Sequence, residues 1–282
     1  MEFSFTRYLS AKRTVDDRSL NAYVRETLLA ALPAGPLAIL EIGAGTGTMV
    51  DRLMGNGLPG IGGSYTAIDA DTANVAAARS RLAGQSLPFV LELETVDVYD
   101  FIDRERGRRA WDLIVAHAVL DLLELPRALP GLLALARPGG MFYFTINFDG
   151  LTILEPVIDP ELDEQVIALY HRTMDERHVG SRPAGHSRTG RQLLAAIPVA
   201  GGTILAAGSS DWVVVPIAGA YPADEVYFLR HILHFFETSL KGHPELDQER
   251  FAAWLARRNA QIDDAGLIYI AHQIDICGRA SG

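Results

Sequence analysis

Apolar residues in this chain form short runs that alternate with stretches in which they recur every three or four positions. The runs at 37–40, 65–68, 89–96, 111–116 and 141–146 are typical of buried strands. Helical spacing follows at 72–82 and at 121–136, with Asp71 and Asp121 as the starting residues. Strands and helices that alternate in this way predict a doubly wound, mostly parallel α/β sheet.

The first strand leads into a glycine turn that has a carboxylate directly before it. Glu41 precedes the turn, and Gly43, Gly45 and Gly47 occupy every second position. Glycine lets the backbone pass close beneath a ligand, whereas the dinucleotide fingerprint GxGxxG would need glycine at Thr48. A carboxylate here repels phosphate and suits a cation such as a sulfonium or ammonium group. The turn therefore favours S-adenosylmethionine (SAM) over NAD as the ligand.

Polar residues follow the later strands at their carboxyl ends, where open α/β sheets bind ligands. Asp69 ends the second strand and can accept hydrogen bonds from both hydroxyls of a ribose. Asp97 can accept the amino proton of adenine, with the ring of Tyr99 beside it, or it can simply cap the next helix. His117 and Asn147 end the fourth and fifth strands.

These motifs resemble those of the class I SAM-dependent methyltransferases. The resemblance covers residues 37–149 and rests on the turn at 41–47, the strand ends at 67–69 and 111–117, and the Arg-Pro-Gly-Gly break at 137–140. It implies a seven-stranded, Rossmann-like sheet with an antiparallel last strand, and SAM as methyl donor with S-adenosylhomocysteine (SAH) as product. The residues expected around the cofactor are then Arg13, Glu41, Gly43, Ala44, Gly45, Gly47, Asp69, Ala70, Asp97, Val98, Tyr99 and His117.

The methyl acceptor is marked less strongly than the cofactor. The fourth strand lacks the Asn-Pro-Pro-Tyr type of tetrapeptide that follows it in many enzymes acting on nucleic acid or protein, so the chain looks more like the branch that methylates small molecules. Candidate general bases are His117, Asp149 and His171, because imidazole and carboxylate can take a proton from an acceptor. His117 ranks first by its place at a strand end, and the alternative is that it only lines the cofactor pocket.

A second histidine-containing pattern lies on the helix expected at 160–177. His171, Asp175 and His178 fall on one helical face, which we interpret as a polar face rather than a metal site. No metal is therefore expected.

Four regions are expected along the chain. They are an N-terminal helical lid at 1–36, the SAM-binding core at 37–149, an insertion at 150–190 that shapes the acceptor pocket, and a C-terminal part at 191–282 that completes the sheet and adds cap helices. In the last part we expect strands at 212–216 and 267–271 and helices at 223–240 and 248–262.

Composition limits the partners and the location. The 282 residues carry a formal net charge of −10, which argues against a nucleic-acid partner because phosphate binding needs a basic face. A single cysteine, Cys277, cannot form an intramolecular disulfide, and the N-terminus shows no signal pattern. These features favour a cytoplasmic protein without a membrane span, and they leave a homodimer open.

The sequence thus predicts a SAM-dependent methyltransferase that transfers a methyl group to a small molecule by in-line displacement. Three alternatives remain. They are a different SAM reaction such as aminopropyl transfer, a SAM-binding module without catalysis, and an NAD-linked oxidoreductase, which the glycine spacing disfavours.

Overall fold

Side chains along strand β1 (Ala38–Ile42) point alternately to the two faces of a central sheet, as the two-residue period of a strand requires. The computed structural model describes residues 3–55 and 62–281. Ile39 packs into an apolar cluster on one face, whereas Leu40 and Ile42 pack into a cluster on the other. The strand is therefore buried on both sides, which explains its continuous apolar sequence.

The sheet has the order β3-β2-β1-β4-β5-β10-β8, and β9 also pairs with β10. Five strands run parallel, and β10 runs antiparallel to β5, while β8 and β9 run antiparallel to β10. This confirms the predicted doubly wound, mostly parallel sheet, with eight strands among the described residues where seven were expected. The bounds are β2 (Ser64–Asp69), β3 (Val90–Thr95), β4 (Trp111–His117), β5 (Ala136–Glu155), β8 (Gly202–Ser209), β9 (Trp212–Val214) and β10 (Ile268–Ala280).

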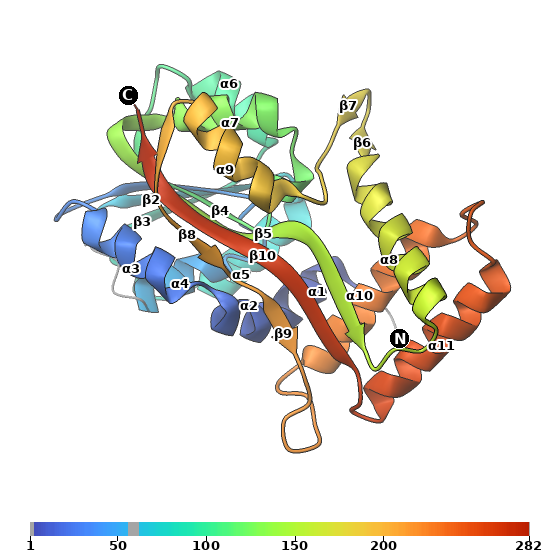
Figure 1. The fold of residues 1–282 in the computed structure, drawn as a ribbon. Helices are drawn as coiled ribbons and strands as arrows, with labels where there is room; N and C mark the ends of the chain where they lie inside the picture. The colour runs from blue at the N-terminus through green and yellow to red at the C-terminus, as the bar shows by residue number, and fades with distance from the viewer. Residues whose placement is uncertain (1–2, 56–61, 282) are drawn as a thin grey trace.

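Helices cover both faces of this sheet (Figure 1). One face carries α3 (Ala22–Ala31), α4 (Thr48–Gly55) and α5 (Thr72–Leu82), and the other carries α6 (Val98–Glu105), α7 (Leu125–Leu133) and α9 (Thr189–Val199). Asp71 caps α5 as predicted, because its carboxylate accepts a hydrogen bond from the backbone N of Ala73 at 2.8 Å.

Strands β5 and β10 continue past the rest of the sheet as an antiparallel ribbon that carries a second group of helices (Figure 1). A third apolar cluster joins this ribbon to helices from both ends of the chain, and we call this part the helical lobe. Its helices are α1 (Phe5–Ala11), α2 (Arg13–Ser19), α8 (Pro160–Asp175), α10 (Glu225–Leu240) and α11 (Gln248–Asp263). A short hairpin of β6 (His178–Val179) and β7 (Arg182–Pro183) follows α8.

Three predicted elements were wrong in their bounds. The strands predicted at 141–146 and 267–271 are 20 and 13 residues long, because register shifts interrupt their pairing and break the apolar period that marks a strand. The predicted helix at 121–136 is a 3₁₀ turn, η1 (Leu120–Leu122), followed by α7, whose first turn holds Pro126. Proline is favoured there and disfavoured within a helix.

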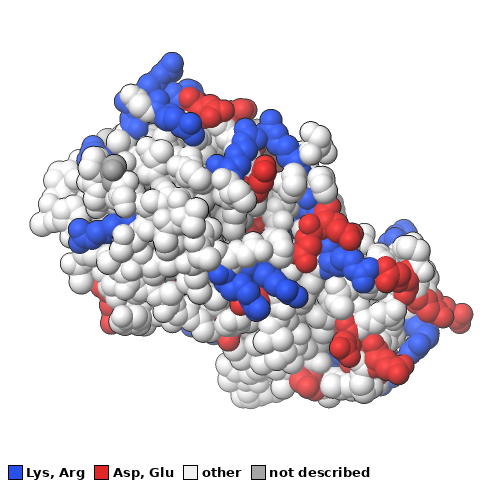
Figure 2. Space-filling view, turned by 45° about the horizontal axis from the view of Figure 1, so that its top comes forward, with Lys and Arg blue, Asp and Glu red and all other residues white. Residues whose placement is uncertain are grey.

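Charged side chains of both signs are intermingled on the face shown in Figure 2. In the basic segment 104–109, Arg104 pairs with Glu94 at 2.5 Å and Arg109 pairs with Glu92 at 3.0 Å. These arginines therefore belong to solvated ion pairs, which contribute little to stability. Among the described residues, no helix combines the length and apolar character needed to cross a membrane.

Candidate active site

A cavity of about 300 Å³ lies at the carboxyl ends of β1, β2 and β4. The order of the strands along the chain reverses between β1 and β4, which is where open α/β sheets bind ligands. We call it the first cavity. It contains every residue predicted around the cofactor except Arg13, Gly47 and Tyr99. The members are Glu41, Gly43, Ala44, Gly45, Asp69, Ala70, Asp97, Val98 and His117.

The glycine turn and Asp69 form one hydrogen-bonded unit in the wall of the first cavity. A Cβ atom on Gly43 would lie 2.4 Å from Val119, so only glycine fits there. The backbone N of Gly45 donates to Asp69 at 2.8 Å, and the backbone N of Asp71 and the amide of Asn74 donate to the other carboxylate oxygen at 2.9 and 3.2 Å. These donors fix the Asp69 carboxylate, which keeps further lone pairs for a ligand.

Glu41 lies near the end of β1, directly before the glycine turn, and its side chain is buried. Its carboxyl accepts a hydrogen bond from the hydroxyl of Tyr65 at 2.7 Å. Burial raises the pKa of Glu41 to about 8, and the bond from Tyr65 offsets only part of that effect. The carboxyl is therefore largely protonated at neutral pH, and a cation placed beside it would favour its ionised form.

Asp97 combines the two roles that were considered for it. Its carboxylate caps α6 by accepting from the backbone N of Tyr99 at 2.8 Å, and the residue also lines the first cavity. Tyr99 lies outside that lining. Its hydroxyl accepts a bond from the backbone N of Glu124 at 3.0 Å, and the guanidinium of Arg127 lies 4.3 Å from its ring. Tyr99 therefore holds the start of α7 against α6.

Gly47 and Arg13 also lie outside the lining of the first cavity. Gly47 packs against α5, where an added Cβ would lie 3.0 Å from Leu82. Arg13 is half-exposed and lies 3.6 Å from both Asp17 and Asp51. The structure thus places Arg13 in a surface ion-pair group rather than in the wall of the cavity.

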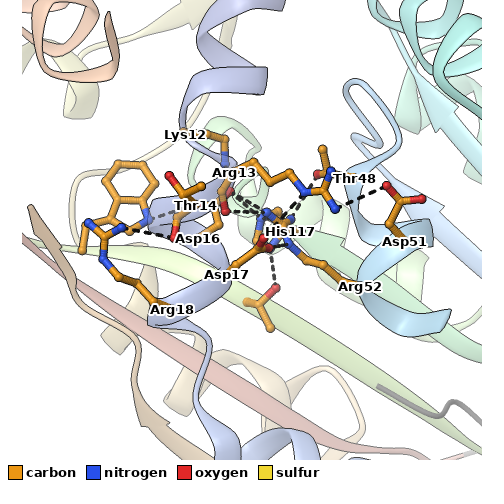
Figure 3. Close-up of polar contacts among 12 residues, drawn as sticks. Lys12, Arg13, Thr14, Asp16, Asp17, Arg18, Thr48, Asp51, Arg52 and His117 are labelled. Atoms are coloured by element: carbon orange, nitrogen blue, oxygen red, sulfur yellow. Dashed lines mark hydrogen bonds and ion pairs between the residues drawn. The ribbon is translucent and has the colours of Figure 1, made fainter. Parts of the chain in front are cut away.

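A buried group of charges, which we call the Asp16 network, adjoins the first cavity, and its members Lys12 and His117 belong to the lining of that cavity (Figure 3). The carboxylate of Asp16 is 2.6 Å from Lys12 Nζ, 3.3 Å from Arg52 and 3.0 Å from His117 Nε2, and it accepts a bond from the indole of Trp212 at 3.0 Å. Burial alone would raise the pKa of Asp16, but Lys12 and His117 hold it well below its usual range. Sequence reasoning missed this network, and its only local sign is the Lys-Asp spacing of four on α2.

His117 has a partner at each ring nitrogen. Nε2 lies 3.0 Å from both the carboxylate of Asp16 and Nη1 of Arg52, and Nδ1 lies 2.8 Å from the hydroxyl of Thr145. Burial, together with the charge of Arg52 at 3.0 Å, lowers the pKa of His117 to about 4. The imidazole is neutral at pH 7, yet neither nitrogen is free for an acceptor. The arrangement therefore favours the lining role over the role of general base.

A second cavity of about 340 Å³ adjoins the first beneath α1. The shared wall consists of Phe5, Leu9, Lys12, Ala118 and Leu122. Ala118 and Ile146, which lines the second cavity, have φ angles of +52° and +54°, a conformation that residues other than glycine rarely adopt and that clusters at functional sites. The remaining wall combines aromatic, aliphatic and polar side chains. Its aromatic members are Tyr8, Phe148, Tyr170, Trp212, Phe235 and Tyr269, and its polar members are Asp121, Thr152, Arg177, Ser239 and Gln273.

The other two candidate bases lie outside the lining of both cavities. Asp149 accepts from the backbone N and the side chain of Arg191 at 2.7 and 2.9 Å, and so anchors the start of α9. His171 contacts the hydroxyl of Thr152, a second-cavity residue, at 3.0 Å, and burial lowers its pKa. His171 therefore supports the wall from behind.

The histidines and aspartate predicted on one face of α8 do not gather around a shared point. His171 contacts Thr152, Asp175 accepts from the backbone N of Ser187 at 2.7 Å, and His178 contacts the backbone O of Glu176 at 2.7 Å. Within residues 3–55 and 62–281, no three His, Cys, Asp or Glu side chains are grouped as metal ligands.

Comparison with known proteins identifies the sheet region. Residues 40–142 match the family model described as a methyltransferase domain. No curated protein matches the chain. Similar solved structures include a putative sarcosine dimethylglycine methyltransferase from Galdieria sulphuraria, with 15% identity, coverage of 94% of this chain and 85% of that one, and a TM-score of 0.46.

Two further solved structures are similar over most of this chain. The cyclopropane synthase MmaA2 from Mycobacterium tuberculosis shows 11% identity, coverage of 96% and 98%, and a TM-score of 0.48. Phosphoethanolamine N-methyltransferase 2 from Haemonchus contortus shows 10% identity, coverage of 99% and 58%, and a TM-score of 0.48. At these identities and scores, none of the three bears on the acceptor. Residues 40–142, which include the glycine turn, Asp69, Asp97 and His117, therefore form a methyltransferase domain.

Proposed function

We propose that the protein transfers the methyl group of SAM to a small molecule held in the second cavity. The observation that carries this proposal is the shared wall between the two cavities, which brings an acceptor next to the cofactor site. The volume of about 340 Å³ falls in the range of small-molecule sites. SAM, when bound, supplies an electrophilic methyl group on a sulfonium.

The first cavity has the features that SAM requires. Asp69 offers acceptor lone pairs to the ribose hydroxyls, and Asp97 offers them to the adenine amino group. Gly43 and Gly45 leave room for the methionine part, and Glu41 provides a carboxyl for its cationic groups. A Cβ atom at position 43 would clash with Val119 in the wall of the first cavity.

The protein's contribution to methyl transfer is to hold the acceptor in line and to keep water out. Helix α1 forms a wall of both cavities, and aromatic side chains line part of the second. His117, with both ring nitrogens occupied, fixes the end of β4 between the cavities. Transfer by in-line displacement requires no covalent intermediate on the protein.

Filling the second cavity should separate cofactor binding from transfer. Ile232 lines the second cavity and is absent from the lining of the first. In Ile232→Trp we expect unchanged SAH affinity by calorimetry and loss of at least about 90% of SAH formation in a screen of defined amines, phenols, thiols and carboxylic acids, since a bulkier ring would take the acceptor's space. Leu205→Trp, at an exposed position on β8, is the control and should keep both properties. Full turnover by Ile232→Trp would contradict this placement of the acceptor.

Binding of SAM should release a proton through Glu41. Because burial raises the pKa of this carboxyl to about 8, it is mostly protonated at pH 7, and a cationic ligand that favours the charged form expels the proton. Titrations at pH 7 in buffers of different ionisation enthalpy should report a release approaching one proton, and Glu41→Gln should abolish it. Equal release from the variant would mean that Glu41 does not face the cation.

The same pKa predicts how stability depends on pH in the ligand-free protein. The pKa of Glu41 is higher in the folded protein than in the unfolded chain, so its protonated form stabilises the fold. This contribution to the free energy of unfolding is complete at a pH below the usual pKa of a glutamate, and it is lost as the pH rises through about 8. The melting temperature of the wild type should therefore fall between pH 5 and pH 8 more steeply than that of Glu41→Gln.

A further inference from the structure

Two buried acceptor atoms of the second cavity have no hydrogen-bond partner among the described residues. They are Oδ1 of Asp121 and Oε1 of Gln273. Gln273 is only 2% exposed, and it comes from β10, whereas Asp121 lies in η1. A buried polar atom without a partner is costly, and structures normally satisfy it. Two such atoms in one cavity wall indicate a ligand that donates hydrogen bonds.

Asp121 lines the second cavity together with Tyr8 and Tyr170. Arg177 lines the same cavity, and its charge favours the ionised form of Asp121 by lowering the pKa of this carboxyl against the effect of burial. Lys12 is held by Asp16 at 2.6 Å and is therefore not available to Asp121.

We infer that the methyl acceptor is an amine whose N–H groups donate to Asp121 and Gln273, with its carbon skeleton among the aromatic side chains of the second cavity. This inference rests on the proposed function and names the substrate class for that site. A half-turn of the Gln273 amide would exchange its oxygen and nitrogen. A carboxylate accepts hydrogen bonds in either orientation, so Asp121 determines that the ligand must be a donor, and the Gln273 side chain adds a second hydrogen bond.

The chemistry of the wall distinguishes an amine from other acceptors. An alcohol has one O–H and can satisfy only one of the two acceptor atoms, and a carboxylate has no donor for either of them. An ammonium group can donate to both atoms and also gains from the faces of neighbouring aromatic rings. Phe148, Trp212 and Phe235 extend this apolar surface for the rest of the molecule.

Asp121 can also remove the proton that an ammonium must lose before it attacks. The ammonium gives one proton to the Asp121 carboxylate, which leaves a neutral amine with a free lone pair. That lone pair forms the new N–C bond as the C–S bond of SAM breaks with its electrons staying on sulfur. The products are a methylammonium, SAH and protonated Asp121, so charge and atoms balance. Burial raises the pKa of Asp121, which eases the proton transfer.

Three ligands of similar size test the inference on the full chain loaded with SAH. They are 2-phenylethylamine, 2-phenylethanol and 3-phenylpropionate, each titrated by calorimetry. We expect the amine to bind the wild type about tenfold or more tighter than the alcohol, as a hydrogen bond to a charged group allows. Asp121→Asn and Gln273→Leu should each reduce this preference, the first to about twofold or less. Asp103→Asn removes one charge at an exposed position of α6 and should change nothing.

The outcomes separate this inference from the proposed function. Equal or tighter binding of the alcohol or the acid by the wild type overturns the amine assignment, as does an amine preference that survives in both variants. SAH affinity, measured in each variant, reports whether the fold and the first cavity remain intact. Incubation with SAM and the amine, followed by mass analysis for N-methylation, tests transfer itself. An amine preference without any methylated product would contradict the methyltransferase proposal and leave the recognition of amines standing.

Discussion

Asp69→Ala is expected to weaken SAM binding by roughly 100-fold or more. Two hydrogen bonds from ribose hydroxyls to a carboxylate are lost, at about 1.5–3 kcal/mol each. The same change removes the acceptor that holds the backbone N of Gly45 at 2.8 Å, so the glycine turn loses its anchor as well. Calorimetric titration with SAM and with SAH measures the effect.

A matched substitution tests whether this loss is local. Asp100→Ala removes a carboxylate from an exposed position of α6 and should leave the affinity for SAM within about twofold of the wild type. Asp69→Asn keeps one acceptor oxygen and should fall between the two. If Asp69→Ala bound SAM as tightly as the wild type, the ribose would have to lie elsewhere in the first cavity.

Asp16→Ala is expected to lower the free energy of unfolding by about 3–5 kcal/mol. The change leaves Lys12 and Arg52 as buried cations without their shared carboxylate, and removal of one partner from a buried ion pair is strongly destabilising. Urea denaturation of the ligand-free protein measures it. Lys12→Met added to Asp16→Ala should recover part of the loss, because Arg52 still pairs with Asp17 at 2.6 Å and the unpaired ammonium of Lys12 is then replaced by an apolar side chain.

The pH dependence of this difference has a definite sign. Lys12 and His117 hold the pKa of Asp16 below its usual range, so its contribution is present above a pH of about 3.9 and is lost as the pH falls below that value. The difference in unfolding free energy between wild type and Asp16→Ala should therefore stay constant from pH 8 to pH 5. A difference below about 1 kcal/mol throughout that range would show that the network is not a source of stability.

The cofactor half of the site could be predicted because its signals are local in the sequence. Each strand end carries its own polar residue, and Glu41, Asp69 and His117 follow apolar runs that mark the strands. Parallel strands bring these ends to one edge of the sheet without any knowledge of loops. Arg13 and Tyr99, which the same reasoning placed around the cofactor, lie outside the lining of the first cavity, since proximity in sequence does not show which way a side chain turns.

The Asp16 network and the second cavity could not be predicted because they are assembled from distant segments. The contact between Asp16 and His117 joins residues 101 positions apart. The second cavity takes walls from α1, α8, α10 and β10, whose mutual placement depends on the extension of β5 beyond the sheet. Asp121 was assigned to the start of a helix, where a carboxylate is common, yet the chain forms a 3₁₀ turn there and buries the side chain. Tertiary packing overrode the local preference of this segment.

The position of α1 couples the two ligands thermodynamically. Phe5, Leu9 and Lys12 line both cavities. A ligand in one cavity that orders this segment therefore lowers the conformational entropy that a ligand in the other cavity would lose on binding. By linkage, the factor by which SAM raises the affinity for an acceptor equals the factor by which the acceptor raises the affinity for SAM. Under the proposed placement of SAM, transfer also removes the sulfonium charge beside Glu41, so SAH is held less tightly than SAM. One short helix thereby links retention of the substrates to release of the products.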